Sequence, residues 1–296
     1  MRRIAVLLIS TLSILAAQEG RVSGPVSGIL FERNAVRAVL GVAGASHLSP
    51  ALIRDADYAE ASRDGGMVAF SKAGRIAVLS LSDGVERAIA EGSSREMEWN
   101  TSNALAFENG GHVFVWRASD NSLSDFGALA NVTDLAIDAE GRAVFAAVGG
   151  NDAGVYRLQE NASPILLATL SGDASLTLDA RGSALLVADG RQVLEVATAG
   201  GAARIAPDAV EPSGVAASSN GRYLAVADRG SNAVLIYETA TKALVRRVEV
   251  DFAPSRLEAL GKDLFLLNER SSTQALEVLS LQNDANVYFI PAAVEE

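Results

Sequence analysis

Short apolar runs separated by polar turns recur along this chain at a nearly constant interval. Each turn has a polar-polar-Gly character or a close variant of it, and an apolar run follows at once. The turn residues are Gly65, Asn103, Gly141, Gly182, Gly221 and Gly261, at intervals of 38, 38, 41, 39 and 40 residues. Self-similarity at one period indicates a repeat fold, and a period near 40 built from short strands is typical of propeller blades.

The repeat from Pro212 to Phe252 shows the plan of one blade. A small-residue strand leads to a tight turn at Gly221, where glycine meets the positive φ that such hairpins require. The next strand is almost wholly apolar, as expected when both of its faces are covered. The outer strand mixes Val and Leu with Arg and Glu, which indicates partial exposure. The four predicted strands are 215–217, 223–227, 233–237 and 244–250.

The same plan predicts six complete four-stranded repeats between about Asp55 and Ala292. Upstream, Val26–Phe31 and Val36–Val42 are interpreted as the last two strands of a seventh, incomplete blade, which lets the chain ends meet and shields neighbouring sheet edges. The C-terminal strand Asn286–Pro291 is expected near this seam. We therefore predict an all-β β-propeller of four-stranded antiparallel blades, seven in number. The alternative is six blades with an added hairpin.

A resemblance to a known family rests on the best-defined repeat. Residues 211–216 (EPSGVA), 219–227 (SNGRYLAVA) and 231–239 (SNAVLIYET) resemble the YVTN-type repeat of bacterial seven-bladed propellers. That superfamily includes lactonase-like propellers and surface-layer repeat proteins. The resemblance is strong over 211–254 and weaker over 138–197. The resemblance implies the fold. It does not imply a function, because members of the superfamily include enzymes, binding modules and structural proteins.

The first residues have the pattern of an export signal. Arg2 and Arg3 form a basic start, Ile4–Leu15 an apolar run, and Ala16-Ala17 a small-residue exit. The apolar run is shorter than the roughly 20 residues that span a bilayer. We predict a cleaved signal peptide over residues 1–17, one propeller domain over 18–296, a periplasmic or secreted protein, and no membrane span after cleavage. The alternative is a buried N-terminal helix.

Composition excludes several function classes. The chain has 296 residues, 49% of them hydrophobic, and no cysteine, so disulfides, thiol nucleophiles, thiolate metal sites and lipid attachment at a cysteine are excluded. The formal net charge of −11 repels phosphate backbones, so we expect no nucleic-acid partner.

Polar residues gather in the predicted loops between second and third strands, which reach one face of a propeller. Variable loops on a rigid scaffold are where binding residues collect. The predicted binding residues are Glu108, His112, Asp152, Asp189, Arg191, Asp228, Arg229, Asn268, Glu269 and Arg270. The alternative is ordinary turn chemistry, because turns favour the same Asp, Asn, Gly and Ser residues.

No motif fixes a catalytic or metal site. Only two histidines are present, His47 and His112, too few for a His-rich metal site, and the calcium-binding Asp/Asn loop that ends in Glu is missing. A nucleophile elbow of the form G-x-S-x-G is missing as well. Lactonase-like propellers place acidic, basic and imidazole side chains at the mouth of their central channel, but no spacing here carries those roles over. We expect no catalytic residue, no metal and no cofactor.

Trp99, between Glu98 and Asn100, is a candidate stacking platform that points into the channel, whereas Trp116 is expected in the core. The function predicted from these features is an exported, monomeric, non-catalytic binding module for a protein segment, a glycan or a small polar ligand. The alternatives are a lactonase-like hydrolase and a structural, surface-layer-type component of the envelope.

Overall fold

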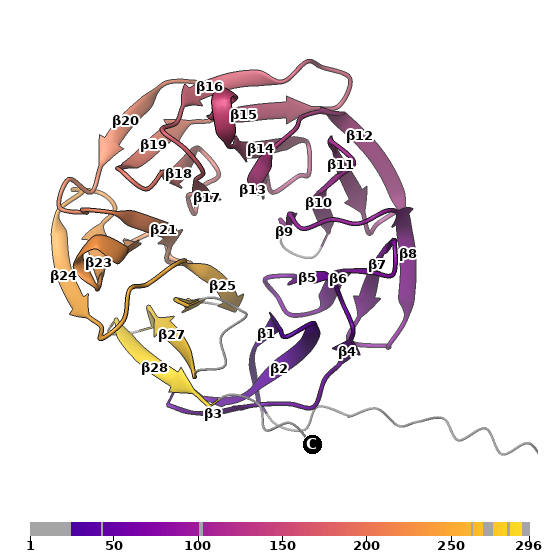
Figure 1. The fold of residues 1–296 in the computed structure, drawn as a ribbon, viewed down its shortest axis with the longest axis horizontal. Helices are drawn as coiled ribbons and strands as arrows, with labels where there is room; N and C mark the ends of the chain where they lie inside the picture. The colour runs from indigo at the N-terminus through magenta and orange to yellow at the C-terminus, as the bar shows by residue number, and fades with distance from the viewer. Residues whose placement is uncertain are drawn as a thin grey trace, which may run out of the picture.

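The computed structural model describes residues 25–42, 44–100, 103–261, 263–268, 275–282 and 285–291. Seven four-stranded antiparallel sheets form a ring around a common axis (Figure 1). The predicted β-propeller and its seven blades are therefore confirmed. We number the blades 1 to 7 in chain order. The predicted signal segment, residues 1–17, lies outside the described residues, and no helix within them has the length and apolar character needed to cross a bilayer.

In blades 2–7, consecutive strands lie progressively farther from the axis. The first strands are β1 (Val26–Glu32), β5 (Tyr58–Ala61), β9 (Met97–Trp99), β13 (Val132–Ile137), β17 (Ser175–Leu178), β21 (Pro212–Ala217) and β25 (Glu258–Gly261). The second strands are β2 (Ala35–Val42), β6 (Met67–Lys72), β10 (Ala104–Asn109), β14 (Ala143–Val148), β18 (Ala184–Ala188), β22 (Tyr223–Asp228) and β26 (Leu264–Leu266).

The third and fourth strands complete the blades. The third strands are β3 (Ala45–Leu48), β7 (Arg75–Ser80), β11 (His112–Arg117), β15 (Gly154–Gln159), β19 (Val193–Ala197), β23 (Ala233–Glu238) and β27 (Leu276–Ser280). The fourth strands are β4 (Ile53–Arg54), β8 (Glu86–Glu91), β12 (Ser122–Ala128), β16 (Ile165–Thr169), β20 (Ala202–Ile205), β24 (Leu244–Glu249) and β28 (Asn286–Ile290). Two short 3-10 turns, η1 (Gly150–Asp152) and η2 (Arg229–Ser231), lie in loops.

The hydrophobic pattern explains this layering. Every residue of β14 is buried, whereas five of the six residues of β24 are exposed. Second strands are covered by a neighbouring blade on each face, so they need no polar face. Gly141 and Gly221 adopt φ of +67° in the turns that lead into second strands, as predicted.

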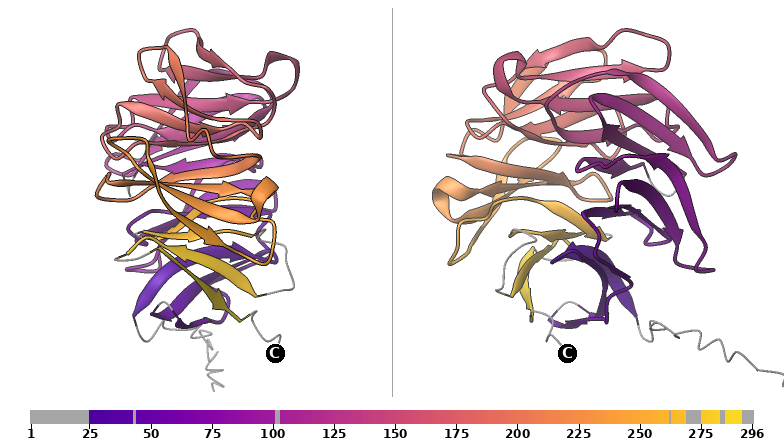
Figure 2. Two further views of the ribbon diagram at one scale, coloured as in Figure 1. Left: turned by 90° about the vertical axis from the view of Figure 1, so that its left-hand side faces the viewer. Right: turned by 45° about the vertical axis from the view of Figure 1, so that its right-hand side comes forward.

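The hydrophobic core lies between blades rather than inside any one of them. The buried apolar side chains form seven clusters, and each cluster joins two adjacent blades, including blades 7 and 1. Burying one such Val, Leu, Ile or Phe side chain contributes about 1.5–3 kcal/mol. A sheet alone cannot cover its apolar faces, so the ring is stable only when it is closed. Figure 2 shows the resulting stack of sheets from the side.

The ring has two different faces. In blades 2–6, the loops between second and third strands and the connectors that precede first strands lie on one face, which we call the loop face. The tight turns between first and second strands and between third and fourth strands lie on the opposite face, the turn face. Arg229 belongs to the loop face, and Gly65 and Gly84 belong to the turn face.

Blade 1 differs from the others in the direction of its strands. Between blades 6 and 7, the Ser213 hydroxyl donates to the Pro254 carbonyl at 2.7 Å, so the beginnings of β21 and β25 lie together. At the seam between blades 7 and 1, a methyl group on Gly28, near the beginning of β1, would overlap the carbonyl oxygen of Leu260, near the end of β25. Strand β1 is therefore antiparallel to the first strand of blade 7.

The contacts of blade 1 with blade 2 show the same reversed direction of β1. The Asn34 carbonyl, in the β1–β2 turn, accepts a hydrogen bond from the Ala56 amide at 3.0 Å, just ahead of β5. The end of β1 thus lies on the loop face, where β5 begins. The outer part of blade 1 is split, because β3 pairs with the end of β2 and β4 pairs with its beginning.

These observations correct one expectation. The segments interpreted as the last two strands of an incomplete blade are instead its two strands nearest the axis, and β1 lies against both β5 and β25. Strands β1 and β2 run in the directions of second and third strands, respectively. The C-terminal strand β28 lies beside β3 at the seam, as predicted.

Trp99 does not point into a central channel. Its side chain is 1% exposed, its Nε1 donates to the Glu60 carbonyl at 3.1 Å, and its ring meets Trp116 edge-on at 6.2 Å. Both tryptophans belong to the core between blades 2 and 3.

Candidate functional site

The predicted loop-face residues include four whose side chains close their own loops. Asp189 is 4% exposed and accepts hydrogen bonds from the Ser171 hydroxyl at 2.7 Å and the Gln192 amide at 3.0 Å. Burial works to raise the pKa of this carboxyl, but hydrogen bonds from Ser171, Arg191 and Gln192 together lower it below its usual range. Asp189 is thus an ionised group that joins the connector at Ser171 to the β18–β19 loop at Gln192.

Asp228, Asn268 and Glu108 have similar roles. Asp228 is fully buried and accepts from the Glu211 amide at 2.7 Å. Asn268 donates to the Ala275 carbonyl at 3.0 Å, and Glu108 accepts from the Gly111 amide at 2.7 Å. Side chains of this kind satisfy backbone groups that strand pairing leaves unpaired.

The other predicted residues are more accessible. Arg229 is ion-paired with Glu211, and His112 Nδ1 lies 3.0 Å from a carboxylate oxygen of Asp125, with both partners about half exposed. Asp152 and Arg191 are exposed. Glu269 and Arg270 lie outside the described residues. Within the described ranges, none of these side chains forms a hydrogen bond or ion pair with another member of the set in a different blade, so the loop-face site stays a prediction.

The described structure instead has a large hollow on the turn face, above blade 1. Its volume is about 1470 Å³. The reversed direction of blade 1 accounts for it. In blades 2, 4, 5 and 6, whose turns the structure describes in full, two turns lie on this face, but the β1–β2 turn of blade 1 lies on the loop face. The turn residues Arg63 and Asp83 of blade 2 and the residues Gly261 and Gln282 of blade 7 consequently line opposite sides of a gap.

The hollow combines apolar walls with a polar rim. The apolar residues are Val26, Ile29, Val42, Leu52, Leu79, Leu81, Leu260 and Leu264, and the polar ones are Arg63, Asp64, Ser80, Ser82, Asp83 and Gln282. Val26 and Val42 are 48% and 60% exposed, which is unusual for valines on strands nearest a propeller axis. Apolar walls with a few placed polar groups are typical of ligand and peptide sites.

The charged groups at the rim are held in place. Arg63 lies 2.8 Å from a carboxylate oxygen of Glu98, and this ion pair joins blades 2 and 3. Hydrogen bonds from Ser80 and from the Val85 amide lower the pKa of Asp83. The rim therefore presents fixed charges beside an apolar floor.

Carboxylates also collect on the strands nearest the axis. Burial raises the pKa of Asp134 to about 7, and the negative charges of Glu98 and Glu60 add to this effect, against a hydrogen bond from the Leu176 amide at 2.8 Å. Asp134 thereby links blade 4 to blade 5. No three Asp, Glu or His side chains gather in a metal-binding geometry within the described part of the chain.

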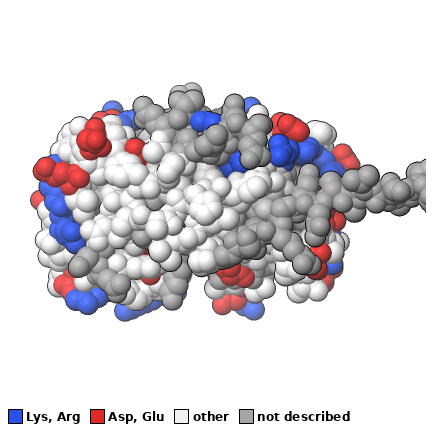
Figure 3. Space-filling view, turned by 90° about the horizontal axis from the view of Figure 1, so that it is seen from below, with Lys and Arg blue, Asp and Glu red and all other residues white. Residues whose placement is uncertain are grey.

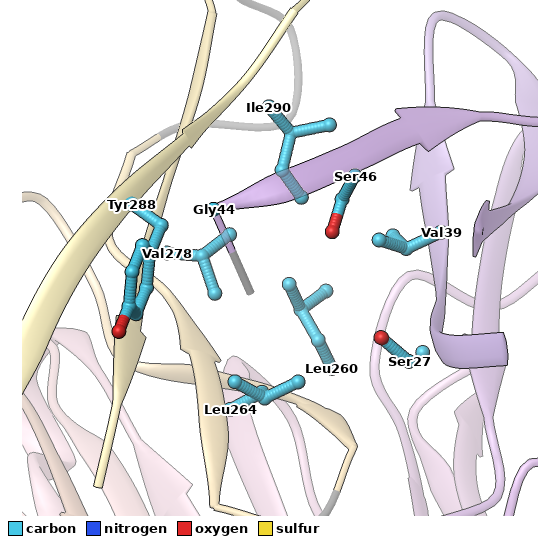
Figure 4. Close-up of a pocket in the computed structure, with 10 residues that line it drawn as sticks. Ser27, Val39, Gly44, Ser46, Leu260, Leu264, Val278, Tyr288 and Ile290 are labelled. Atoms are coloured by element: carbon cyan, nitrogen blue, oxygen red, sulfur yellow. The ribbon is translucent and has the colours of Figure 1, made fainter. Parts of the chain in front are cut away.

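A second, much smaller cavity lies in the seam itself (Figure 4). Leu260, Leu264 and Val278 of blade 7 approach Val39 of blade 1 there. The Ser27 hydroxyl beside them donates its hydrogen bond to the Gly41 carbonyl and so offers no free donor to the cavity. This cavity is a packing defect in an apolar junction rather than a polar site.

The hollow was not predicted from the sequence. It follows from the reversed direction of blade 1, for which the apolar pattern carries no signal.

No protein-family model matches the chain, and no curated protein matches it by sequence. Solved structures with the same fold do match. A functionally unknown protein from Desulfotomaculum acetoxidans DSM 771 is 11% identical, with a TM-score of 0.63 over 91% of this chain and 100% of that one. A streptogramin B lyase is 14% identical, with a TM-score of 0.59 over 79% and 82%.

A chain of the mitotic checkpoint complex is 14% identical, with a TM-score of 0.62 over 99% of this chain and 90% of that one. At such identities the similarity shows the propeller fold alone. One of the three is described as functionally unknown and another as a lyase, so no function is transferred from them.

Proposed function

We propose that this protein is a non-catalytic binding module that holds its partner in the hollow on the turn face. The observation that carries the proposal is the gap left by the reversed first blade. The hollow joins an apolar floor to fixed charges at the rim. Such a surface suits a segment of another protein, which supplies apolar side chains for the floor and polar groups for the rim.

The structural neighbours, at 11% to 14% identity, do not choose between a binding and a catalytic function. One of them is a chain of a multiprotein complex, the mitotic checkpoint complex. Another is a lyase, and the sequence resembles the YVTN-type repeat of a superfamily that also contains lactonase-like enzymes. We propose membership of that superfamily, and export through the N-terminal signal, as parts of the same account. The loop-face residues Arg229 and His112 belong to the alternative binding surface.

A thermal-shift screen against peptides, sugars, lactones and divalent ions tests the proposal. A ligand at 100 times its dissociation constant stabilises the folded protein by about 2.7 kcal/mol. Each hit is then repeated with Val42→Arg, which places a charged side chain against the apolar wall of the hollow, and with Val245→Arg as the matched control. Val245 is 53% exposed on β24, far from the hollow.

The proposal predicts that Val42→Arg abolishes the stabilisation while Val245→Arg keeps it. A hit that survives Val42→Arg but is lost in the double variant Arg229→Ala, Arg270→Ala assigns binding to the loop face and contradicts the hollow. Turnover of a lactone by the wild-type protein contradicts the non-catalytic part of the proposal and favours the hydrolase.

A further inference from the structure

The small seam cavity and the turn-face hollow adjoin each other. Four residues line both of them, namely Ser27, Gly28, Leu260 and Leu264. The other lining residues of the seam cavity belong to the junction between blades 7 and 1, with Val39 on one side and Val278 on the other (Figure 4). The packing defect is therefore a recess beside the site proposed above rather than an isolated void.

The lining of the seam cavity suits an apolar group. Its aliphatic side chains are Val39, Leu260, Leu264, Val278 and Ile290. The hydroxyls of Ser27 and Ser46 both donate to backbone carbonyls of β2, and none of the described residues that line the cavity is charged. Figure 3 shows that the outer surface over the seam is also largely uncharged, with charged groups toward its margins. A charged group of a ligand would therefore leave water here without a counter-charge.

The size of the seam cavity limits the group that fits. Its volume is about 20 Å³, compared with about 1470 Å³ for the hollow. One water-sized group needs about 10–15 Å³, so the cavity has room for one or two methyl groups and is too small for an aromatic ring. None of the described residues that line the hollow is aromatic, so the hollow offers no ring on which a sugar could stack.

We propose that the seam cavity is an anchor subsite of the hollow, and that the partner is a polypeptide segment with one Val, Leu or Ile side chain whose terminal methyl groups enter the cavity. Binding energy at protein interfaces is concentrated in side chains that fill such pockets. A polypeptide also has polar backbone groups for the rim of the hollow. The inference rests on the function proposed above and specifies the chemistry of the partner.

Xenon tests the subsite itself, because small apolar cavities stay dry and bind this gas. In methyl NMR spectra of the full chain under xenon pressure, the Leu264 methyl signals should shift. Val39→Ile and Val278→Ile each add one carbon to the cavity wall, and each should remove most of this shift. Val248→Ile, at a half-buried position on β24 of blade 6, is the matched control and should keep the shift. Absence of the shift in the wild-type protein, as when the chain's own residues ahead of Pro25 fill the cavity, overturns the proposal.

Random peptides displayed on phage test the chemistry of the partner. Peptides selected on the wild-type protein should share one Val, Leu or Ile, and changing this residue to Asp should raise the dissociation constant at least about tenfold. Val39→Ile and Val278→Ile should weaken binding of the same peptides about tenfold, whereas Val248→Ile should not. Unfolding curves show which variants remain folded, and the two test positions lie in different blades, so each is a check on the other.

The outcomes separate this inference from the proposed function. Peptides that are lost with Val42→Arg but bind folded Val39→Ile and Val278→Ile as tightly as the wild-type protein confirm the hollow and overturn the anchor subsite. Selected peptides without a shared aliphatic residue overturn it as well. Peptides that are unaffected by Val42→Arg, or a selection that yields no peptide, overturn the proposed function, and the anchor subsite with it.

Discussion

Gly28 of the first blade and Gly261 of the last lie against each other across the seam that closes the ring. A methyl group built on Gly261 would lie 3.7 Å from the Gly28 Cα and would overlap the Ser27 carbonyl oxygen. A methyl group on Gly28 would overlap the Leu260 carbonyl oxygen. The two antiparallel strands therefore approach more closely than any side chain permits, and the junction behind them is apolar.

The first prediction concerns this close approach. Gly28→Ala should lower the free energy of unfolding by about 1–3 kcal/mol, because the added methyl group forces the two backbones apart. Gly172→Ala is the control. A methyl group there meets no atom within 4 Å, so this change should be neutral or slightly stabilising. Urea unfolding measures both, and equal stability of the two variants would show that the seam is not tightly packed.

The second prediction separates structural from binding roles on the loop face. Asp228→Ala leaves the Val210 and Glu211 amides without their acceptor and should cost at least about 1–3 kcal/mol of unfolding free energy. Asp152→Ala, at an exposed loop position, should change stability by less than about 0.5 kcal/mol. Thermal or urea unfolding measures both. If Asp228→Ala is as stable as the wild-type protein, Asp228 has no structural role and is again a candidate ligand contact.

The third prediction concerns pH. The Asp134 carboxyl has an ordinary pKa of 3.8 in the unfolded chain and a pKa of about 7 in the folded protein. A raised folded pKa means that the protonated form is favoured by folding. The contribution of this group is therefore fully present below about pH 4 and is lost as the pH rises through 7.

Between pH 5 and pH 8 the wild-type protein should consequently lose about 2–3 kcal/mol of unfolding free energy relative to Asp134→Asn. Urea unfolding of both proteins at the two pH values gives this difference, and any pH-independent cost of the substitution cancels. A difference that does not change with pH would mean that Asp134 is ionised throughout this range.

The repeat pattern was sufficient to predict the propeller, because turn glycines and apolar second strands follow from the demands of a sheet covered on both faces. The second strands β14 and β22 begin where the apolar runs begin. The reversal of blade 1 was not predictable. An apolar run reads the same whether a strand points toward the loop face or the turn face, and only the packing of Gly28 on Leu260 reveals the direction.

The candidate site was less predictable than the fold, for a related reason. Asp189 and Asp228 lie in the predicted loops, but their carboxylates accept hydrogen bonds from the loops and connectors that surround them. Asp and Asn are favoured both for turn closure and for ligand binding, so residue type alone does not separate the two roles. The hollow beside Val42 follows from strand direction and has no local motif.

The most direct test of the reversed first blade is a nuclear Overhauser measurement on deuterated protein with protonated glycine. The structure predicts a cross-peak between the α protons of Gly28 and Gly261, since these residues are in contact where β1 begins and β25 ends. If blade 1 had the direction of the other six, Gly261 would instead lie beside the end of β1 near Glu32. Absence of the Gly28–Gly261 cross-peak, with a cross-peak from the Gly261 α protons to the Glu32 amide proton in its place, would contradict both the reversal and the origin of the hollow.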